Sequence, residues 1–279
     1  MKIFFIVLFI TGMAFTSYAD EGLSAAEPQH GYSTDDIILT SLGTWVVVGA
    51  KTPRGIDCSD SVSEIYITDY STDMIAVFDY TGTLVDQIAC PGEVPDVAGI
   101  CQGPDFLLIN DFGSDTDIYR YQSGTWTPDF TNPASAPTGM DMDATGAIWE
   151  IEASTNTLYR FDASGTLLNQ WILSEPPASA SAMACTIFPI NGTNVVLIGG
   201  MTWSDFYFYE WDGTDLTFIG THVTPQSSNK SYGAAWCSQR DTIFWVYKGG
   251  GTFYVCEFQC FITGVALERT TWGAIKAAI

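Results

Sequence analysis

Positive charge is scarce in this chain. Its 279 residues include 10 lysines and arginines against 32 aspartates and glutamates, which gives a formal net charge of −22. A surface of this sign repels the phosphates of nucleic acids and the headgroups of anionic membranes, and it keeps a monomer soluble. We therefore expect no nucleic-acid partner and a monomeric protein. Because 14% of the residues are aromatic and only 15% are charged, we expect a folded chain rather than a disordered acidic one.

Histidine and the motifs of nucleophilic catalysis are also scarce. The chain has two histidines, His30 and His222, and no Gly-x-Ser-x-Gly segment. A Ser-His-Asp set in the folded region would therefore depend on His222 alone. The segment Lys248-Gly249-Gly250-Gly251 lacks the Gly-Lys-Ser/Thr ending of a phosphate-binding loop, and we interpret it as a hairpin turn. The sequence offers no complete catalytic set.

The hydrophobic run at the N-terminus is shorter than the roughly 20 residues of a membrane-spanning helix. It extends from Ile3 to Phe15, after Lys2 and before the small residues of Ser17-Tyr18-Ala19. This pattern indicates a secretory signal peptide over residues 1–19, with a membrane anchor as the alternative. We expect a secreted protein, extracellular or periplasmic, that has no transmembrane segment after cleavage and begins with a polar leader over residues 20–35.

The chain does contain an internal repeat. Five segments end in an aromatic residue, two or three polar residues, a glycine and a further strand-like run, as in Val77–Leu84 and Arg160–Leu167. The glycines of these turns lie 41 to 51 residues apart and are Gly82, Gly124, Gly165, Gly213 and Gly264. Units of roughly 40–50 residues with several short strands are typical of β-propeller blades.

We therefore predict an all-β fold, a β-propeller over residues 36–269 with five four-stranded blades, six blades being the alternative. Ile37–Thr40 and Thr44–Val48 lie on either side of Gly43 and precede the first full repeat. We predict that these N-terminal strands join the last blade and close the ring, because closure removes an exposed sheet edge. Residues 270–279 form a C-terminal tail that is either a sorting segment or a segment packed on the ring.

The third repeat contains Pro137-Thr138-Gly139-Met140-Asp141, Gly146-Ala147-Ile148-Trp149-Glu150 and Asn156–Asp162. It resembles the repeats of the NHL, streptogramin-lyase and SMP-30/gluconolactonase propellers, and the first repeat, with Gly55-Ile56-Asp57, is similar. The resemblance implies a propeller and, in the enzymes of these families, a divalent cation at the mouth of the central channel. Acidic and asparagine side chains hold that cation in the lactonase-like group, whereas the lyase-like group uses histidine with glutamate.

One acidic segment has the spacing of a cation-binding loop. Asp141 and Asp143 stand at alternate positions before Gly146, and Glu152 follows at the twelfth position of the loop. Calcium prefers several hard oxygen ligands, which carboxylates at such positions supply. The segment predicts a calcium site at Asp141, Asp143 and Glu152, and an ordinary turn between two strands is the alternative.

Three aromatic residues fall in predicted loops at comparable places in their repeats: Tyr70, Phe112 and Trp203. We predict that they form an aromatic surface for a protein or glycan ligand. The alternative is that they belong to the core, because both faces of a blade pack against neighbouring blades.

All seven cysteines follow the predicted signal peptide. In an oxidising compartment such cysteines form disulfides. Cys90 and Cys101 lie on either side of Pro91–Asp96, and a bridge between them would pin one blade to the next. Cys58, Cys185 and Cys237 fall at similar places in their repeats, and for them a role as small buried apolar residues is the alternative to disulfide pairing.

Two functions remain in competition at this point. Repeats without a catalytic set favour a secreted, non-enzymatic propeller that acts as a binding or surface-interaction module. The alternative is a divalent-metal-dependent enzyme of the lactonase or lyase kind, with Asp141, Asp143, Glu150 or Glu152 as ligands at the channel mouth. A structural component of a cell envelope is a third hypothesis.

Overall fold

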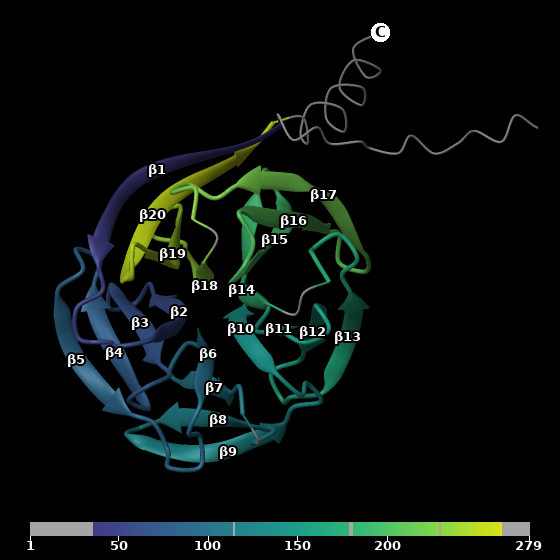
Figure 1. Cartoon of the computed structure of the whole chain (residues 1–279). Helices are drawn as coiled ribbons and strands as arrows, with labels where there is room; N and C mark the ends of the chain where they lie inside the picture. The colour runs from purple at the N-terminus through teal and green to yellow at the C-terminus, as the bar shows by residue number, and fades with distance from the viewer. Residues whose placement is uncertain (1–35, 114, 179–180, 229, 264–279) are drawn as a thin grey trace, which may run out of the picture. The chain divides into compact units, whose positions relative to one another are not determined.

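The computed structural model describes residues 36–113, 115–178, 181–228 and 230–263. The predicted signal peptide, the leader and the C-terminal tail lie outside these residues. The described chain forms 20 β-strands in five antiparallel four-stranded sheets, and these sheets are the blades of a propeller (Figure 1). The prediction of a five-bladed, all-β propeller is confirmed.

Each blade is built from strands that follow one another in the chain, with the first strand at the centre of the ring. The first blade consists of β2 (Pro53–Ser59), β3 (Glu64–Asp69), β4 (Met74–Asp79) and β5 (Leu84–Ala89). The second consists of β6 (Val97–Gln102), β7 (Leu107–Asp111), β8 (Asp117–Gln122) and β9 (Thr125–Thr131). The third consists of β10 (Pro137–Met142), β11 (Ile148–Glu152), β12 (Thr157–Phe161) and β13 (Leu167–Ile172).

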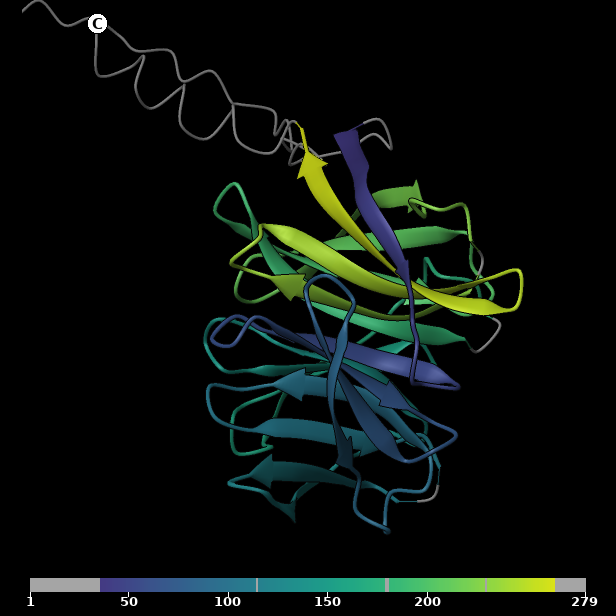
Figure 2. The same ribbon diagram turned by 90° about the vertical axis from the view of Figure 1, so that its left-hand side faces the viewer.

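The fourth blade follows the same order, and the fifth does not. The fourth consists of β14 (Ala182–Ile190), β15 (Thr193–Gly200), β16 (Asp205–Trp211) and β17 (Leu216–Val223). The fifth consists of β18 (Ser231–Cys237), β19 (Thr242–Gly249) and β20 (Thr252–Ile262), with β1 (Ile37–Val46) from the start of the described chain as its outer strand. Figure 2 shows β1 lying along β20.

The N-terminal segment closes the ring as predicted, but it forms one strand where two were expected. Its pairing with β20 continues from Ile37 to Val46, and the register shifts only between Ser41 and Gly43. Gly43 therefore lies at a β-bulge and not in a hairpin turn. A bulge keeps a long strand paired while increasing its twist, so one strand covers the whole edge of β20.

Burial falls from the inner strands to the outer ones. The inner and middle strands are buried on both faces, as in β7 and β11, because each sheet is packed between two other blades. Outer strands such as β5 and β13 are largely exposed. The core is accordingly divided among clusters between the blades, one of which joins the fourth and fifth blades around Phe206, Trp245 and Phe258.

The inner strands are neighbours all around the centre, from β2 through β6, β10 and β14 to β18 and back to β2. One glycine in each of four blades permits the close approach: Gly55, Gly99, Gly139 and Gly233. A Cβ atom on Gly139 would lie 2.6 Å from the Met183 oxygen and the Cys185 nitrogen of the next inner strand. The fourth blade has Ala184 near this place, and it packs opposite Gly139.

Candidate functional site

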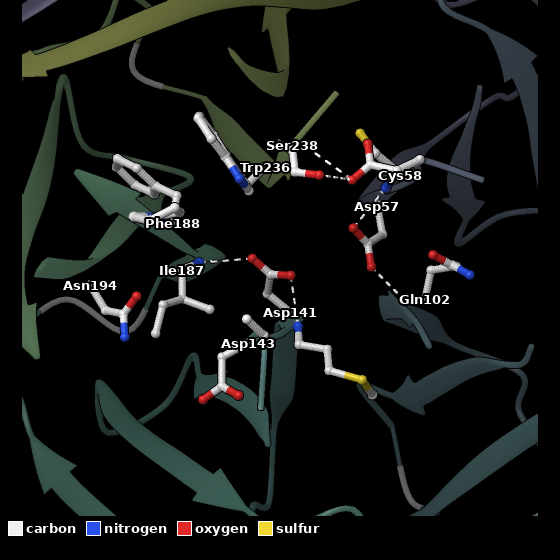
Figure 3. A pocket seen from close by; sticks show the side chains of 14 residues that line it. Asp57, Cys58, Gln102, Asp141, Asp143, Ile187, Phe188, Asn194, Trp236 and Ser238 are labelled. Atoms are coloured by element: carbon white, nitrogen blue, oxygen red, sulfur yellow. Dashed lines mark hydrogen bonds between the residues drawn. The ribbon is translucent and has the colours of Figure 1, made fainter. Parts of the chain in front are cut away.

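A pocket of about 310 Å³ lies where the inner strands end, at one mouth of the central channel (Figure 3). All five inner strands contribute to it, through residues such as Asp57 on β2, Gln102 on β6, Asp141 on β10, Ile187 on β14 and Trp236 on β18. The site is therefore a product of the ring as a whole and of no single blade.

Asp57 and Asp141 occupy the same place in their blades, two residues after Gly55 and Gly139. An inner strand is the edge strand of its sheet. The backbone N–H groups on its channel side therefore have no neighbouring strand whose carbonyl oxygens could accept their hydrogen bonds. The Asp57 carboxylate accepts hydrogen bonds from its neighbour Cys58 N (2.7 Å) and from Gln102 N of the next blade. It thus satisfies backbone donors on two blades.

Asp141 bonds in the same manner between the third and fourth blades. Its carboxylate accepts from Met142 N at 2.7 Å, from Ile187 N at 2.7 Å and from the Thr186 hydroxyl at 2.5 Å. Figure 3 shows Asp57 and Asp141 side by side in the pocket, with their carboxyl groups on the cavity side of their strands. The geometry has brought together two buried acids from blades that are not adjacent.

Burial favours the protonated forms of both acids, and the charge of Asp141 adds to this effect at Asp57. Burial raises the pKa of Asp57 well above its ordinary value, and the charge of Asp141 raises it further. Burial also raises the pKa of Asp141 to about 7, against the lowering effect of its hydrogen bonds. Because the pKa of Asp141 is raised to about 7, the charge of the pocket floor changes near neutral pH.

Two further aspartates stand at the rim of the pocket. Asp143 accepts from Thr145 and from the Trp149 indole, and its carboxylate lies 3.6 Å from the guanidinium of Arg160. Although burial favours the neutral acid, the hydrogen bonds lower the pKa of Asp143. Asp60 accepts from the backbone N–H groups of Ser238 and Gln239, both at 3.2 Å. The rim therefore carries two carboxyl groups, one of which is paired with an arginine.

One wall of the pocket is aromatic. The half-buried Trp236 stacks on the buried Phe188, with ring centroids 5.6 Å apart and planes at 26°. No lysine or arginine is among the described residues that line the pocket. The site combines a flat apolar surface with hydrogen-bond acceptors, and it suits a group that carries donors or a positive charge.

The structure separates the residues predicted to bind calcium. Asp141 and Asp143 line the pocket, but Glu152 pairs with Pro137 at the opposite end of the β10–β11 hairpin, whereas Asp141 pairs with Trp149. Glu152 accepts hydrogen bonds from Ser135, Ser154, Thr155 and Tyr159. The three carboxylates do not converge as the loop prediction requires, because Asp141 lies near the turn of the hairpin and Glu152 lies three residues beyond its partner Trp149, toward the open end.

The cation site that the family resemblance implies would combine acidic and asparagine side chains. Among the described residues, no group of three or more His, Cys, Asp or Glu side chains is arranged to hold a metal ion. The fully buried Glu150 accepts from the amides of Asn110 (2.9 Å) and Asn132 (2.6 Å) and so is engaged within the protein.

The three predicted binding aromatics all lie in loops at the other mouth of the ring, between the second and third strands of their blades. Trp203 is only 3% exposed and packs edge-on against Tyr207 at 5.5 Å. Tyr70 is half-buried, with the Arg54 guanidinium 4.9 Å from its ring, and Phe112 is 37% exposed. The prediction of a shared aromatic surface was wrong for Trp203, which folds over Gly200 into the core.

The predicted Cys90–Cys101 bridge is absent, and both thiols are free. Cys90 packs with the cluster around Ile100, whereas Cys101 belongs to the cluster around Ile148. Side chains alternate along a strand, so Ile100 and Cys101 point to opposite faces of β6. The bridge prediction failed because Cys101 faces away from Cys90.

Sequence reasoning missed Asp57 and Trp236 as site residues. The repetition of Gly-x-Asp in Gly55-Ile56-Asp57 and Gly139-Met140-Asp141 was a signal for the first of them, because equivalent places in two inner strands lie at the same level of the channel. Trp236 has no comparable local signal.

Among the described residues, no helix is long and apolar enough to cross a membrane.

No protein-family model and no curated protein matches the chain. Among solved structures, virginiamycin B lyase from Staphylococcus aureus is similar with 16% identity and a TM-score of 0.49, over 75% of this chain and 66% of the lyase. A streptogramin B lyase is similar with 13% identity and a TM-score of 0.45, over 81% and 99% of the two chains. A putative gluconolactonase is similar with 12% identity and a TM-score of 0.49, over 79% and 93%. At these identities the likeness concerns the fold, and in fold the chain resembles the β-propellers of these lyases and of gluconolactonase.

Proposed function

We propose that the protein is a non-enzymatic binding module whose ligand enters the pocket at the channel mouth. The observation that carries this proposal is the combination of two buried acids, Asp57 and Asp141, with the aromatic wall of Trp236 in one cavity. Its volume of about 310 Å³ is at the small end of ligand pockets and matches one sugar ring or one side chain.

The chemistry of the lining indicates which ligand would fit. Carboxylates accept hydrogen bonds from hydroxyl and ammonium groups, and an indole face packs against the apolar face of a sugar ring or attracts a cation. We propose a terminal sugar of a glycan, with amino sugars favoured by the negative charge of Asp60 and Asp143. A lysine side chain of a protein partner has related chemistry and is the other outcome to test.

The arrangement of polar groups supports binding over catalysis. Ser238 donates to Asp60, but His222, which the described chain places on the outer strand β17, bonds to Val223 O and does not line the pocket. Nucleophilic catalysis of the serine kind needs a base beside the hydroxyl. The competing hypothesis of a metal-dependent lactonase or lyase lacks a convergent ligand set in the described residues.

The remaining parts of the proposal rest on the sequence. The run over residues 1–19 supports secretion, and the net charge of −22 supports a monomer that binds neither nucleic acid nor anionic membranes. Native mass spectrometry and expression with and without residues 1–19 test these points.

The test of the binding site uses an array of mono- and oligosaccharides that includes glucosamine and galactosamine, followed by titration calorimetry. We expect Asp141→Asn and Trp236→Ala to weaken binding at least tenfold. Asp86→Asn and Trp126→Ala change the same residue types on outer strands and serve as controls that bind normally. A ligand whose affinity is the same in all four variants, or a lactone hydrolysis that Asp141→Asn abolishes, would overturn the proposal.

A further inference from the structure

The first and last blades are in contact at both ends of the seam between their inner strands. At one end, a Cβ atom on Gly233 would lie 2.6 Å from the backbone oxygen of Arg54, so β18 and β2 touch backbone to backbone. At the other end, Asp60 accepts hydrogen bonds from the backbone of Ser238 and Gln239. The inner strands β18 and β2 are therefore in contact both near Gly233 and beside the pocket.

Two cysteines face each other on this seam. Cys58 is the last residue but one of β2 and lines the pocket, and Cys237 is the last residue of β18. The two thiols lie within hydrogen-bonding reach of each other and belong to one hydrophobic cluster. They are 7% and 0% exposed, respectively, so neither side chain is free to turn into solvent.

The surroundings make the two thiols unequal. The Cys237 sulfur lies 3.3 Å from the Tyr80 hydroxyl and 3.3 Å from an Asp60 oxygen. Hydrogen bonding with Cys58 and with Tyr80 lowers the pKa of Cys237, whereas burial raises the pKa of Cys58. A thiolate is the species that attacks in disulfide exchange, so Cys237 is the better resolving thiol.

We propose that Cys58 and Cys237 form a disulfide bond that closes the propeller covalently between its first and last blades. The oxidant is a small disulfide such as oxidised glutathione, which reaches Cys58 through the pocket. Cys58 attacks one sulfur of the oxidant while its proton passes to the departing sulfur, which forms a mixed disulfide and releases one thiol. Cys237 then attacks the Cys58 sulfur and releases the second thiol. Two electrons pass from the cysteines to the oxidant, and the two protons end on the two released thiols.

Such a bond would change what holds the ring together. In the thiol form, closure depends on the pairing of β1 with β20 and on packing between blades. A cross-link between residues so far apart in the chain removes much of the freedom of the unfolded state, which is the main origin of disulfide stabilisation. The oxidised protein is therefore expected to melt at a higher temperature than the reduced one.

The test needs no variant in its first stage. The full chain is incubated with oxidised glutathione, unfolded, and its free thiols are counted with a thiol reagent and mapped by mass spectrometry of peptides. We expect the count to fall from seven to five and the peptide with Cys58 to be joined to the peptide with Cys237. Seven reactive thiols after oxidation, or a bridge between any other pair, would overturn the proposal.

Variants connect the bond to stability. Cys58→Ser and Cys237→Ser should each abolish the cross-link and the difference in melting temperature between oxidised and reduced protein. Cys101→Ser is the matched control, because Cys101 is an equally buried thiol of an inner strand that lies in another cluster. Its two forms should differ in melting temperature as the wild-type forms do, and an equal loss of the difference in this control would also contradict the proposal.

Discussion

The charge of Asp141 raises the pKa of Asp57, although their strands belong to the third and first blades and the second blade stands between them in the ring. This effect is second only to that of burial. Two acids that repel each other in a buried place do not both ionise readily. The pocket therefore keeps a proton at a pH where exposed carboxyl groups have lost theirs.

Replacement of Asp141 by Asn should lower the pKa of Asp57. The substitution removes the repulsion, while burial remains, so the pKa of Asp57 should still lie above its ordinary value. Carbon-13 NMR of the aspartate carboxyl groups measures the change. Asp86→Asn, on the exposed strand β5, is the control and should leave the titration of Asp57 unchanged. An equal titration of Asp57 in wild type and Asp141→Asn would show that the two groups do not interact.

Replacement of Glu150 by Gln should make the protein more stable relative to wild type at pH 8 than at pH 5. Burial raises the pKa of Glu150 to about 7 in the folded state, from an ordinary 4.5. The folded protein therefore holds a proton that the unfolded chain releases, and stability falls as pH rises from 4.5 to 7. The shift corresponds to an effect on the order of 3 kcal/mol, measurable by urea unfolding at the two pH values.

Glu152, two residues along the same strand, should behave with the opposite sign. Burial favours its neutral form, but hydrogen bonds from Ser135, Ser154, Thr155 and Tyr159 outweigh burial and lower the pKa of Glu152 to about 2. Its stabilisation is present above pH 4.5 and is lost as pH falls toward 2. Glu152→Gln should therefore destabilise the protein at pH 7 and flatten the loss of stability in acid. A variant that keeps the wild-type acid profile would rule this out.

Replacement of Gly139 by Ala should destabilise the propeller by roughly 1–3 kcal/mol or more. The added Cβ would lie 2.6 Å from backbone atoms of Met183 and Cys185, and backbone in a neighbouring blade cannot move aside locally. Gly43→Ala is the matched control, because nothing lies within 4 Å of its Cβ position. Denaturant unfolding of both variants measures the difference, and equal midpoints would contradict the role assigned to Gly139.

The blades could be predicted because their signal is local. The aromatic–polar–glycine turns at Gly82, Gly124 and Gly165 have φ values of 84°, 82° and 81°, a conformation that glycine adopts without strain. Each turn lies between the third and fourth strands of its blade, so its recurrence gives the repeat length. The closing strand was predicted from the strands left over before the first repeat.

The site could be predicted only in part, because its contacts join distant segments. The repeated Gly-x-Asp indicates that Asp57 and Asp141 lie at one level of the channel, but nothing in the local sequence indicates that Trp236 will form the aromatic wall beside them. The burial of Trp203 depends on Gly200 offering it a flat surface, which its place in a turn does not reveal. The face of β6 to which the Cys101 side chain points depends on the register of the strand, and the number of residues between Cys90 and Cys101 does not determine that register.

The pairing of β1 with β20 also orders events during translation. The first four blades each consist of strands that leave the ribosome one after another, so each has all four of its strands before the next blade is made. The fifth blade waits for a strand that was made first and a strand that is made last. A chain that stops before residue 252 leaves β1 with no β20 to pair with and with the apolar side chain of Ile37 uncovered. The pairing of β1 with β20 is therefore present only in a chain in which all five blades have been made.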